Sequence, residues 1–121
     1  MIKLVGSKKI YVGKHWSLRL DKFRFSDKII EKEIVEHLPS VGVIPILDKE
    51  YVLLVSQYRT AARKNLLEIP AGKIEQGETP RQAALREMAE EIGYAGTRLV
   101  PLLKIYLAPG YDTEIYAKYY E

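Results

Sequence analysis

The sequence contains no cysteine and no long run of apolar residues. Without cysteine, disulfides and thiolate chemistry are excluded, so any bound metal must be held by Asp, Glu, His or carbonyl oxygen. The longest apolar runs, such as residues 41–47, are far shorter than the roughly 20 residues that a membrane-spanning helix needs. The opening residues, MIKLVGSKK, also lack the apolar core of a signal peptide. We therefore expect a cytoplasmic protein with no membrane segment.

The sequence has little excess of charge. It contains 19 Lys and Arg residues and 16 Asp and Glu residues, which give a net charge of +3. A basic surface favours polyanions, but the basic residues are spread along the chain rather than clustered. Nucleic-acid binding is therefore only a weak alternative, and an anionic small molecule fits the charge as well. With 47% hydrophobic residues in 121, the chain is long enough for a hydrophobic core and short for two domains of ordinary size.

Alternating apolar residues predict β-strands through much of the chain. The stretch from Lys8 to Ile34 indicates a small antiparallel sheet of three strands, with turns at Gly13 and at Ser26–Asp27. The segment KIIEKEIVEHL also fits a helical period, so a helix is the alternative there. Beyond Pro39, the pattern predicts a core hairpin of residues 41–47 and 51–59, a loop over 70–78 and further strands at 66–69, 98–107 and 114–120.

Local signals predict a helix over residues 80–92. Thr79 suits the N-cap position and Gln82 follows it by three residues, as in a capping box. Pro80 suits the first helical position and Gly93 the C-terminal cap. The boundaries of this helix are therefore the best-defined feature of the sequence.

Three glutamates, Glu87, Glu90 and Glu91, crowd the second half of this helix. At about 100° per residue they share one side of it, opposite an apolar face of Leu85, Met88, Ala89 and Ile92. Glu87 and Glu91 form a like-charge i,i+4 pair, which costs about 0.2–0.5 kcal/mol, and the helix dipole also disfavours anions there. One explanation is a solvated face partly neutralised by Arg86. The other is a hard cation such as Mg²⁺, which the preceding glycine loop favours because its backbone groups can approach a ligand closely.

The spacing of these residues resembles the Nudix box, the signature of Nudix hydrolases. Its fixed places are filled by Gly72, Glu78, Arg86, Glu87, Met88, Glu90, Glu91, Gly93 and Tyr94. The resemblance implies an α+β Nudix fold: a mixed β-sheet with the Nudix helix packed on it, as an α/β/α sandwich shortened in its C-terminal part. It also implies that Glu87, Glu90 and Glu91, together with the Ala71 carbonyl, hold Mg²⁺, with Mn²⁺ as an alternative. Glu78 and Arg86 would brace the loop against the helix.

Segments outside the box are similar to ADP-ribose pyrophosphatases, namely SQYR at 56–59, LLEIPAGKIE at 66–75 and LAPGYDTE at 107–114. Carried over by position, Arg59 would contact the diphosphate and Glu114 the terminal ribose, while Glu68 and Gly72 would line the pocket. A guanidinium suits phosphate and a carboxylate suits ribose hydroxyls. The competing interpretations are an exposed cation for Arg59 and a surface carboxylate for Glu114.

The resemblance divides the chain into an N-terminal sheet subdomain, residues 1–38, and a Nudix domain, residues 39–121, expected to be truncated at its C-terminal end. In this subfamily the N-terminal sheet forms a homodimer and helps to clamp the adenine. Trp16, Phe23 and Phe25 are candidates for stacking on the base, assisted by Arg19 or Arg24. For each aromatic residue, ordinary packing ranks ahead of stacking.

The resemblance implies Mg²⁺-dependent hydrolysis of the diphosphate bond of ADP-ribose or a related nucleoside diphosphate sugar, giving AMP and ribose 5-phosphate. The catalytic residues would be Glu87, Glu90 and Glu91. The alternative is a weakly active or inactive ligand-binding or regulatory module of the same fold, lacking the C-terminal portion. The expected partners are a small-molecule substrate and a second copy of the chain, with neither nucleic acid nor membrane.

Overall fold

The structure, a computed structural model, describes residues 1–95 and 98–121. It consists of two compact units, each described separately below. Unit 1 comprises Met1–Leu38 and Tyr106–Ile115, and unit 2 comprises Pro39–Ile105 and Tyr116–Glu121. The sequence likewise predicts a boundary after residue 38, but it assigns residues 106–115 to the second region, whereas the structure places them in unit 1. The assignment of the two regions as separate domains stays a prediction.

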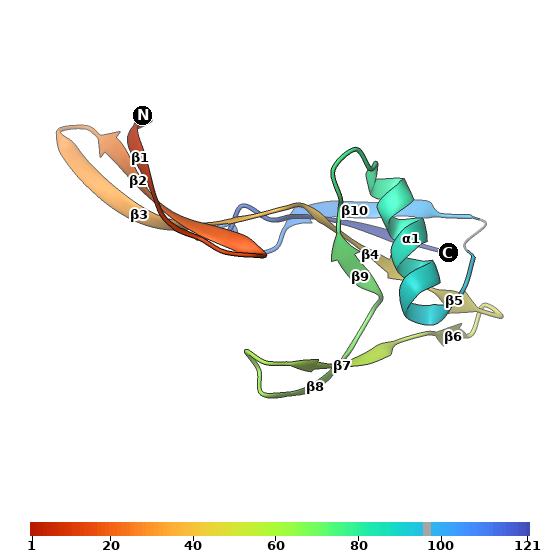
Figure 1. Ribbon diagram of the computed structural model, residues 1–121. Coiled ribbons are helices and arrows are strands. Elements are labelled where there is room, and N and C mark those ends of the chain that lie inside the picture. The colour runs from red at the N-terminus through yellow and green to blue at the C-terminus, as the bar shows by residue number, and fades with distance from the viewer. Residues whose placement is uncertain (96–97) are drawn as a thin grey trace. The chain divides into compact units, whose positions relative to one another are not determined.

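Three antiparallel strands form the sheet of unit 1 (Figure 1). They are β1 (Ile2–Val12), β2 (Trp16–Phe25) and β3 (Lys28–His37), in that order. The strand prediction for KIIEKEIVEHL is confirmed, because β3 pairs with β2 from Lys28 opposite Phe25 to His37 opposite Trp16. Ser26 adopts a positive φ of 59° in the tight turn between them, as two-residue hairpin turns require.

A returning segment of unit 1 extends the free edge of β3. The Val35 N–H donates to the Tyr111 carbonyl at 2.6 Å, and the Thr113 N–H donates to the Val35 carbonyl at 3.0 Å. The His37 N–H donates to the Thr113 hydroxyl oxygen at 2.9 Å. These bonds hold residues 111–114 beside the end of β3.

Unit 2 is built on a mixed four-stranded sheet in the order β10, β11, β4 and β9. The strands are β10 (Val100–Tyr106), β11 (Ile115–Tyr120), β4 (Ser40–Ile44) and β9 (Ala71–Lys73). β11 runs parallel to β4, and β9 runs antiparallel to it. The predicted mixed sheet is thus present, although β9 falls inside the stretch 70–78 that was predicted to be a loop.

The predicted core hairpin of residues 41–47 and 51–59 is confirmed only at its turn, where Ile46–Leu47 pair with Tyr51–Val52, and is wrong for the rest. β4 is buried between β9 and β11, and it stops before Pro45, which has no N–H to donate to a ladder. The remaining residues form two small exposed hairpins instead. These pair β5 (Ile46–Leu47) with β6 (Tyr51–Val52), and β7 (Val55–Arg59) with β8 (Lys64–Glu68).

The predicted helix is confirmed as α1 (Pro80–Ile92), with a capping box at its start. The Gln82 N–H donates to the Thr79 hydroxyl oxygen at 3.1 Å, and the Thr79 N–H donates to Gln82 Oε1 at 2.9 Å. Gly93 ends the helix with a φ of 73°. No helix in residues 1–95 or 98–121 is long and apolar enough to span a membrane.

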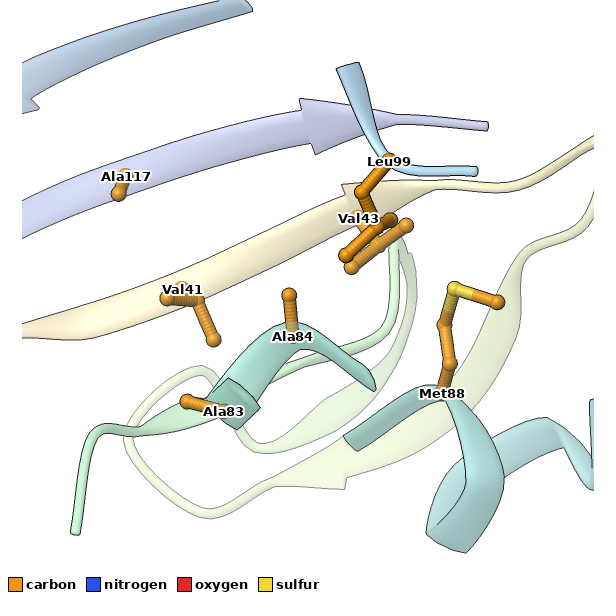
Figure 2. Close-up of a cluster of buried hydrophobic side chains, with 7 residues drawn as sticks. All are labelled: Val41, Val43, Ala83, Ala84, Met88, Leu99 and Ala117. Atoms are coloured by element: carbon orange, nitrogen blue, oxygen red, sulfur yellow. The ribbon is translucent and has the colours of Figure 1, made fainter. Parts of the chain in front are cut away.

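One cluster of buried side chains joins α1 to the sheet of unit 2 (Figure 2). Its members are Val41, Val43, Ala83, Ala84, Met88, Leu99 and Ala117. The predicted apolar face is therefore partly wrong, since Ala89 is exposed and Glu87 is buried. The reason is that α1 contacts β9 as well as β4, so the acidic side of the helix is partly covered by the strand that precedes it.

Candidate functional site

Arg86 is the centre of the hydrogen-bond network on α1. Its Nε and Nη2 donate to the two carboxylate oxygens of Glu78 at 2.8 and 3.0 Å. Nη2 also donates to the Lys73 carbonyl at 2.9 Å, and Nη1 donates to Glu87 at 2.7 Å and to Glu90 at 3.3 Å. A guanidinium has five N–H donors, so these five bonds use all of them. The predicted Glu78–Arg86 brace is present and ties the loop to the helix.

Glu87 packs directly against the backbone of Gly72. A Cβ atom placed on Gly72 would lie 2.0 Å from Glu87 Oε1 and 2.1 Å from its Cδ, which is far inside any real contact. Only glycine therefore allows this carboxylate to lie against β9. The Glu87 residue is only 9% exposed, and its bond to Arg86 compensates the burial of its charge.

Glu91 lies one helical turn beyond Glu87 and accepts a hydrogen bond from the Ala71 N–H. Partial burial, and then the nearby charge of Glu87, raise the pKa of the Glu91 carboxyl above its ordinary value. The Ala71 hydrogen bond and the charge of Arg59 act in the opposite direction. Burial, more than the charge of Glu87, therefore disfavours the ionised form of Glu91.

The three glutamates occupy one turn, but the three carboxylates do not share a single partner. Glu87 and Glu90 bond Arg86, and Glu91 bonds the Ala71 N–H. Among the described residues, no three Asp, Glu or His side chains already converge as a metal-binding group. Each carboxylate is instead compensated by an N–H donor, Glu87 and Glu90 by the same Nη1 of Arg86 and Glu91 by the Ala71 N–H.

Arg59 and Glu68 form a bidentate pair on the β7–β8 hairpin. Arg59 Nε and Nη2 each donate to one Glu68 carboxylate oxygen at 2.7 Å, and the Arg59 bond lowers the pKa of Glu68. Arg59 also acts electrostatically on Glu91. The structure therefore brings two predicted substrate-binding residues close to one predicted metal ligand within unit 2.

Unit 1 carries an open cleft of about 370 Å³ at the end of its sheet. Trp16 and Arg19, two of the residues predicted to contact the base, line it together with His37 and Thr113. Trp16 also contacts Tyr11, with ring centroids 5.7 Å apart. The other candidates, Phe23, Phe25 and Arg24, are not among the described residues that line this cleft.

Glu114, predicted to contact the terminal ribose, belongs to unit 1 rather than to the unit of the acidic helix. Its Oε1 lies 3.4 Å from His37 Nδ1. The same Nδ1 is 2.6 Å from the Leu38 carbonyl, and a carbonyl can only accept, so Nδ1 carries a proton.

Sequence reasoning missed two groups of this network, the Lys73 carbonyl and His37. The Lys73 carbonyl accepts from Arg86, and a backbone acceptor leaves no trace in residue type. His37 lies 3.4 Å from Glu114 through pairing between distant segments, and only that pairing reveals the contact.

Comparison with known proteins agrees with the fold and with the spacing of the acidic helix. The model of the NUDIX domain matches residues 36–120. Among solved structures, an ADP compounds hydrolase superposes with a TM-score of 0.83 at 22% identity, covering 98% of this chain and 65% of that one. The chain therefore belongs to the Nudix family, and its fold is the Nudix fold.

Two curated relatives are similar over most of the chain. One is an ADP-ribose pyrophosphatase of Bacillus subtilis (strain 168), 35% identical over 114 residues. The other is a methanol dehydrogenase activator of Bacillus methanolicus, 37% identical over 114 residues. Each match covers 93% of this chain and 62% of the relative, so the chain spans less than two thirds of their length. Nudix hydrolases generally use a divalent metal ion.

Proposed function

We propose that this chain hydrolyses the diphosphate bond of ADP-ribose or of a related nucleoside diphosphate sugar, with Mg²⁺, to give AMP and ribose 5-phosphate. The observation that carries the proposal is the Glu87 carboxylate, which lies against Gly72 and close to Glu91 on one side of α1. The names of the similar proteins, ADP-ribose pyrophosphatase and ADP compounds hydrolase, support the substrate class.

The donor set of the acidic turn fits a hard divalent ion. Burial, and then the charge of Glu87, raise the pKa of Glu91, so a cation placed beside both carboxylates would favour their ionised forms. We assign Glu87, Glu90, Glu91 and the Ala71 carbonyl as the groups that would hold Mg²⁺, with Mn²⁺ as an alternative of the same ligand preference. Such an ion neutralises charge on a diphosphate and lowers the pKa of bound water.

The proposed substrate-binding groups are taken unit by unit, Arg59 and Gly72 in unit 2 and Trp16 and Glu114 in unit 1. Arg59 carries a permanent positive charge and pairs well with phosphate oxygens, and its electrostatic effect on Glu91 supports a position at the diphosphate. Gly72 would line the substrate pocket beside the Glu87 carboxylate that lies against it. Trp16 presents a partly exposed ring to the cleft of unit 1, which suits stacking on adenine. Glu114 would accept hydrogen bonds from ribose hydroxyls.

A homodimer through the β1–β3 sheet is part of the proposal. The sheet exposes many apolar side chains: Ile2, Leu4, Val5, Ile10, Tyr11, Val12, Phe25, Ile29 and Ile30. Large exposed apolar surfaces are typical of interfaces. Light scattering after size-exclusion chromatography should give twice the chain mass, and a monomer at micromolar concentration would contradict the dimer. The cytoplasmic location also stays a prediction.

The activity is tested with purified protein, ADP-ribose and Mg²⁺, with AMP and ribose 5-phosphate measured as products. We expect turnover that stops when a chelator is added and returns with excess Mg²⁺. Glu87→Gln keeps the shape of the side chain but removes its charge, and should reduce turnover at least about a hundredfold. Glu50→Gln, a change in the exposed β5–β6 turn, is the matched control. Wild-type turnover in Glu87→Gln would contradict the acidic-turn assignment.

The similarity to a methanol dehydrogenase activator favours a second candidate, a ligand-binding module that regulates another enzyme. This candidate predicts that ADP-ribose binds in a calorimetric titration while no AMP is released. Binding together with release of AMP would exclude it.

A further inference from the structure

Arg59 and Glu68 do not lie opposite each other on the β7–β8 hairpin. Arg59 is paired with Lys64 beside the turn, whereas Glu68 is paired with Val55 at the other end. Side chains at alternate positions of a strand share a face, so Arg59 and Glu68 are on the same face at opposite ends of it. The Arg59 side chain must therefore run back along the hairpin to reach Glu68.

This path determines where the Arg59 guanidinium lies. Its backbone is beside the hairpin turn, but its charge is carried toward the far end, where it acts on Glu91. Glu91 also lines an open hollow of about 220 Å³ with Val55, Ser56 and Gln57 of β7. The guanidinium is thus drawn from the turn toward the part of β7 that lines this hollow with Glu91.

The pair contributes little to folding, because its side chains are 45% and 26% exposed and water already solvates exposed charges well. Its geometry is nevertheless specific, with two bonds of 2.7 Å. The bidentate pair uses the Nε–Nη2 side of the guanidinium. The Nη1 end points away from Glu68, and a guanidinium end of this kind suits a pair of phosphate oxygens.

We propose that Glu68 is a positioning residue, which draws the Arg59 guanidinium along the hairpin and presents its Nη1 end to the diphosphate. The inference rests on the proposed function. It gives Glu68 a role in orienting Arg59, in addition to the predicted role of lining the substrate pocket. A Glu68 that contacted the substrate directly would act independently of Arg59, so the two roles differ in a double-mutant cycle.

Steady-state kinetics with ADP-ribose and Mg²⁺ compare wild type, Glu68→Gln, Arg59→Ala and the double variant. We expect Glu68→Gln to raise KM about tenfold while kcat changes little, because a ground-state contact to the diphosphate is weakened. In the Arg59→Ala background, Glu68→Gln should have no further effect. Glu50→Gln serves as the control for loss of one exposed carboxylate. An equal rise in KM with and without Arg59, or no rise at all, overturns the inference.

A second measurement does not depend on turnover. In the ligand-free protein, the ¹⁵N–¹H resonance of Arg59 Nε should shift on Glu68→Gln and stay unchanged on Glu50→Gln. An unchanged resonance on Glu68→Gln overturns the positioning role even if the wild-type chain is active. Absence of turnover in the wild-type chain instead overturns the proposed function, and the two failures are thereby distinguished.

Discussion

Arg86 and Arg59 each form a bidentate pair with a glutamate, but their surroundings differ. All five N–H donors of Arg86 are used within β9, the following loop and α1. The Glu68 pair takes two of the five donors of Arg59 and lies on an exposed hairpin. A fully bonded arginine cannot bind a substrate without losing a bond, whereas an arginine held by one edge can. An arginine–glutamate pair thus stabilises the fold at Arg86, whereas the pair at Arg59 leaves the arginine suited to binding a ligand.

The largest effect is expected from Gly72→Ala, on the Arg86 side of the comparison. The added methyl group would meet the Glu87 carboxylate at 2.0 Å, so Glu87 must leave its place between Gly72 and Arg86. We expect turnover to fall by about a hundredfold or more while the helical circular dichroism signal is kept. Gly6→Ala, where the added atom meets nothing within 4 Å, is the control. Full activity of Gly72→Ala would show that turnover does not require the contact between Gly72 and Glu87.

Arg86→Lys should affect both stability and activity. Lysine supplies three donors from one point and cannot reproduce the fork that holds Glu78, Glu87 and the Lys73 carbonyl together. We expect a lower melting temperature and a loss of turnover of about ten- to a hundredfold, as for residues that support metal ligands. Arg81→Lys on the same helix, which loses one bond to the Leu99 carbonyl, should change both quantities less. Equal effects of the two variants would contradict the central role of Arg86.

Arg59→Lys should separate binding from stability. Exposed ion pairs contribute about 0.2–1 kcal/mol, so the melting temperature should hardly change. The loss of bidentate phosphate recognition should raise KM for ADP-ribose by about tenfold. Arg63→Lys, in the turn of the same hairpin, is the matched control and should leave KM unchanged. A large drop in melting temperature for Arg59→Lys would contradict the distinction between a structural Arg86 and a binding Arg59.

The smallest effect is expected from acid titration of Glu78. The Arg86 hydrogen bond, and then the Glu75 N–H, hold the pKa of Glu78 below its ordinary value. A lowered pKa in the folded state means that the stabilisation is present above the unfolded pKa of about 4.3 and is lost as pH falls through the folded pKa. Urea midpoints of wild type and Glu78→Gln should therefore differ at neutral pH and converge in acid. A difference that does not change with pH would contradict this linkage.

The helix was predictable because its signals are local. Thr79, Pro80, Gln82 and Gly93 lie within or beside the element that they define, and the structure places α1 at the predicted residues. The Glu78–Arg86 brace was likewise predictable, through the spacing of the Nudix box, and is present. The assignment of Glu87, Glu90 and Glu91 as metal ligands stays a prediction.

The features that the sequence did not predict all depend on contacts between distant segments. The burial of Glu87 follows from β9 lying against α1, and helical periodicity contains no information about that neighbour. The core hairpin failed because β4 pairs with β9 and β11, although the apolar pattern of residues 51–59 suggested a nearer partner. The guanidinium of Arg59 is drawn back along its hairpin toward Glu68, a position that follows from one side-chain pair.

The parallel pairing of β11 with β4 has a consequence for the order in which the protein assembles. Ser40 lies opposite Tyr116 and Ile44 opposite Tyr120, so the two strands are made at well-separated times during synthesis. β4 can pair with β9 earlier, but its pairing with β11 must wait until β11 has been translated, whereas α1 can form from neighbouring residues alone. Closing so long a loop is a slow kind of step in folding. β4, an inner strand of the unit 2 sheet, is thus synthesised early but gains its second neighbouring strand late.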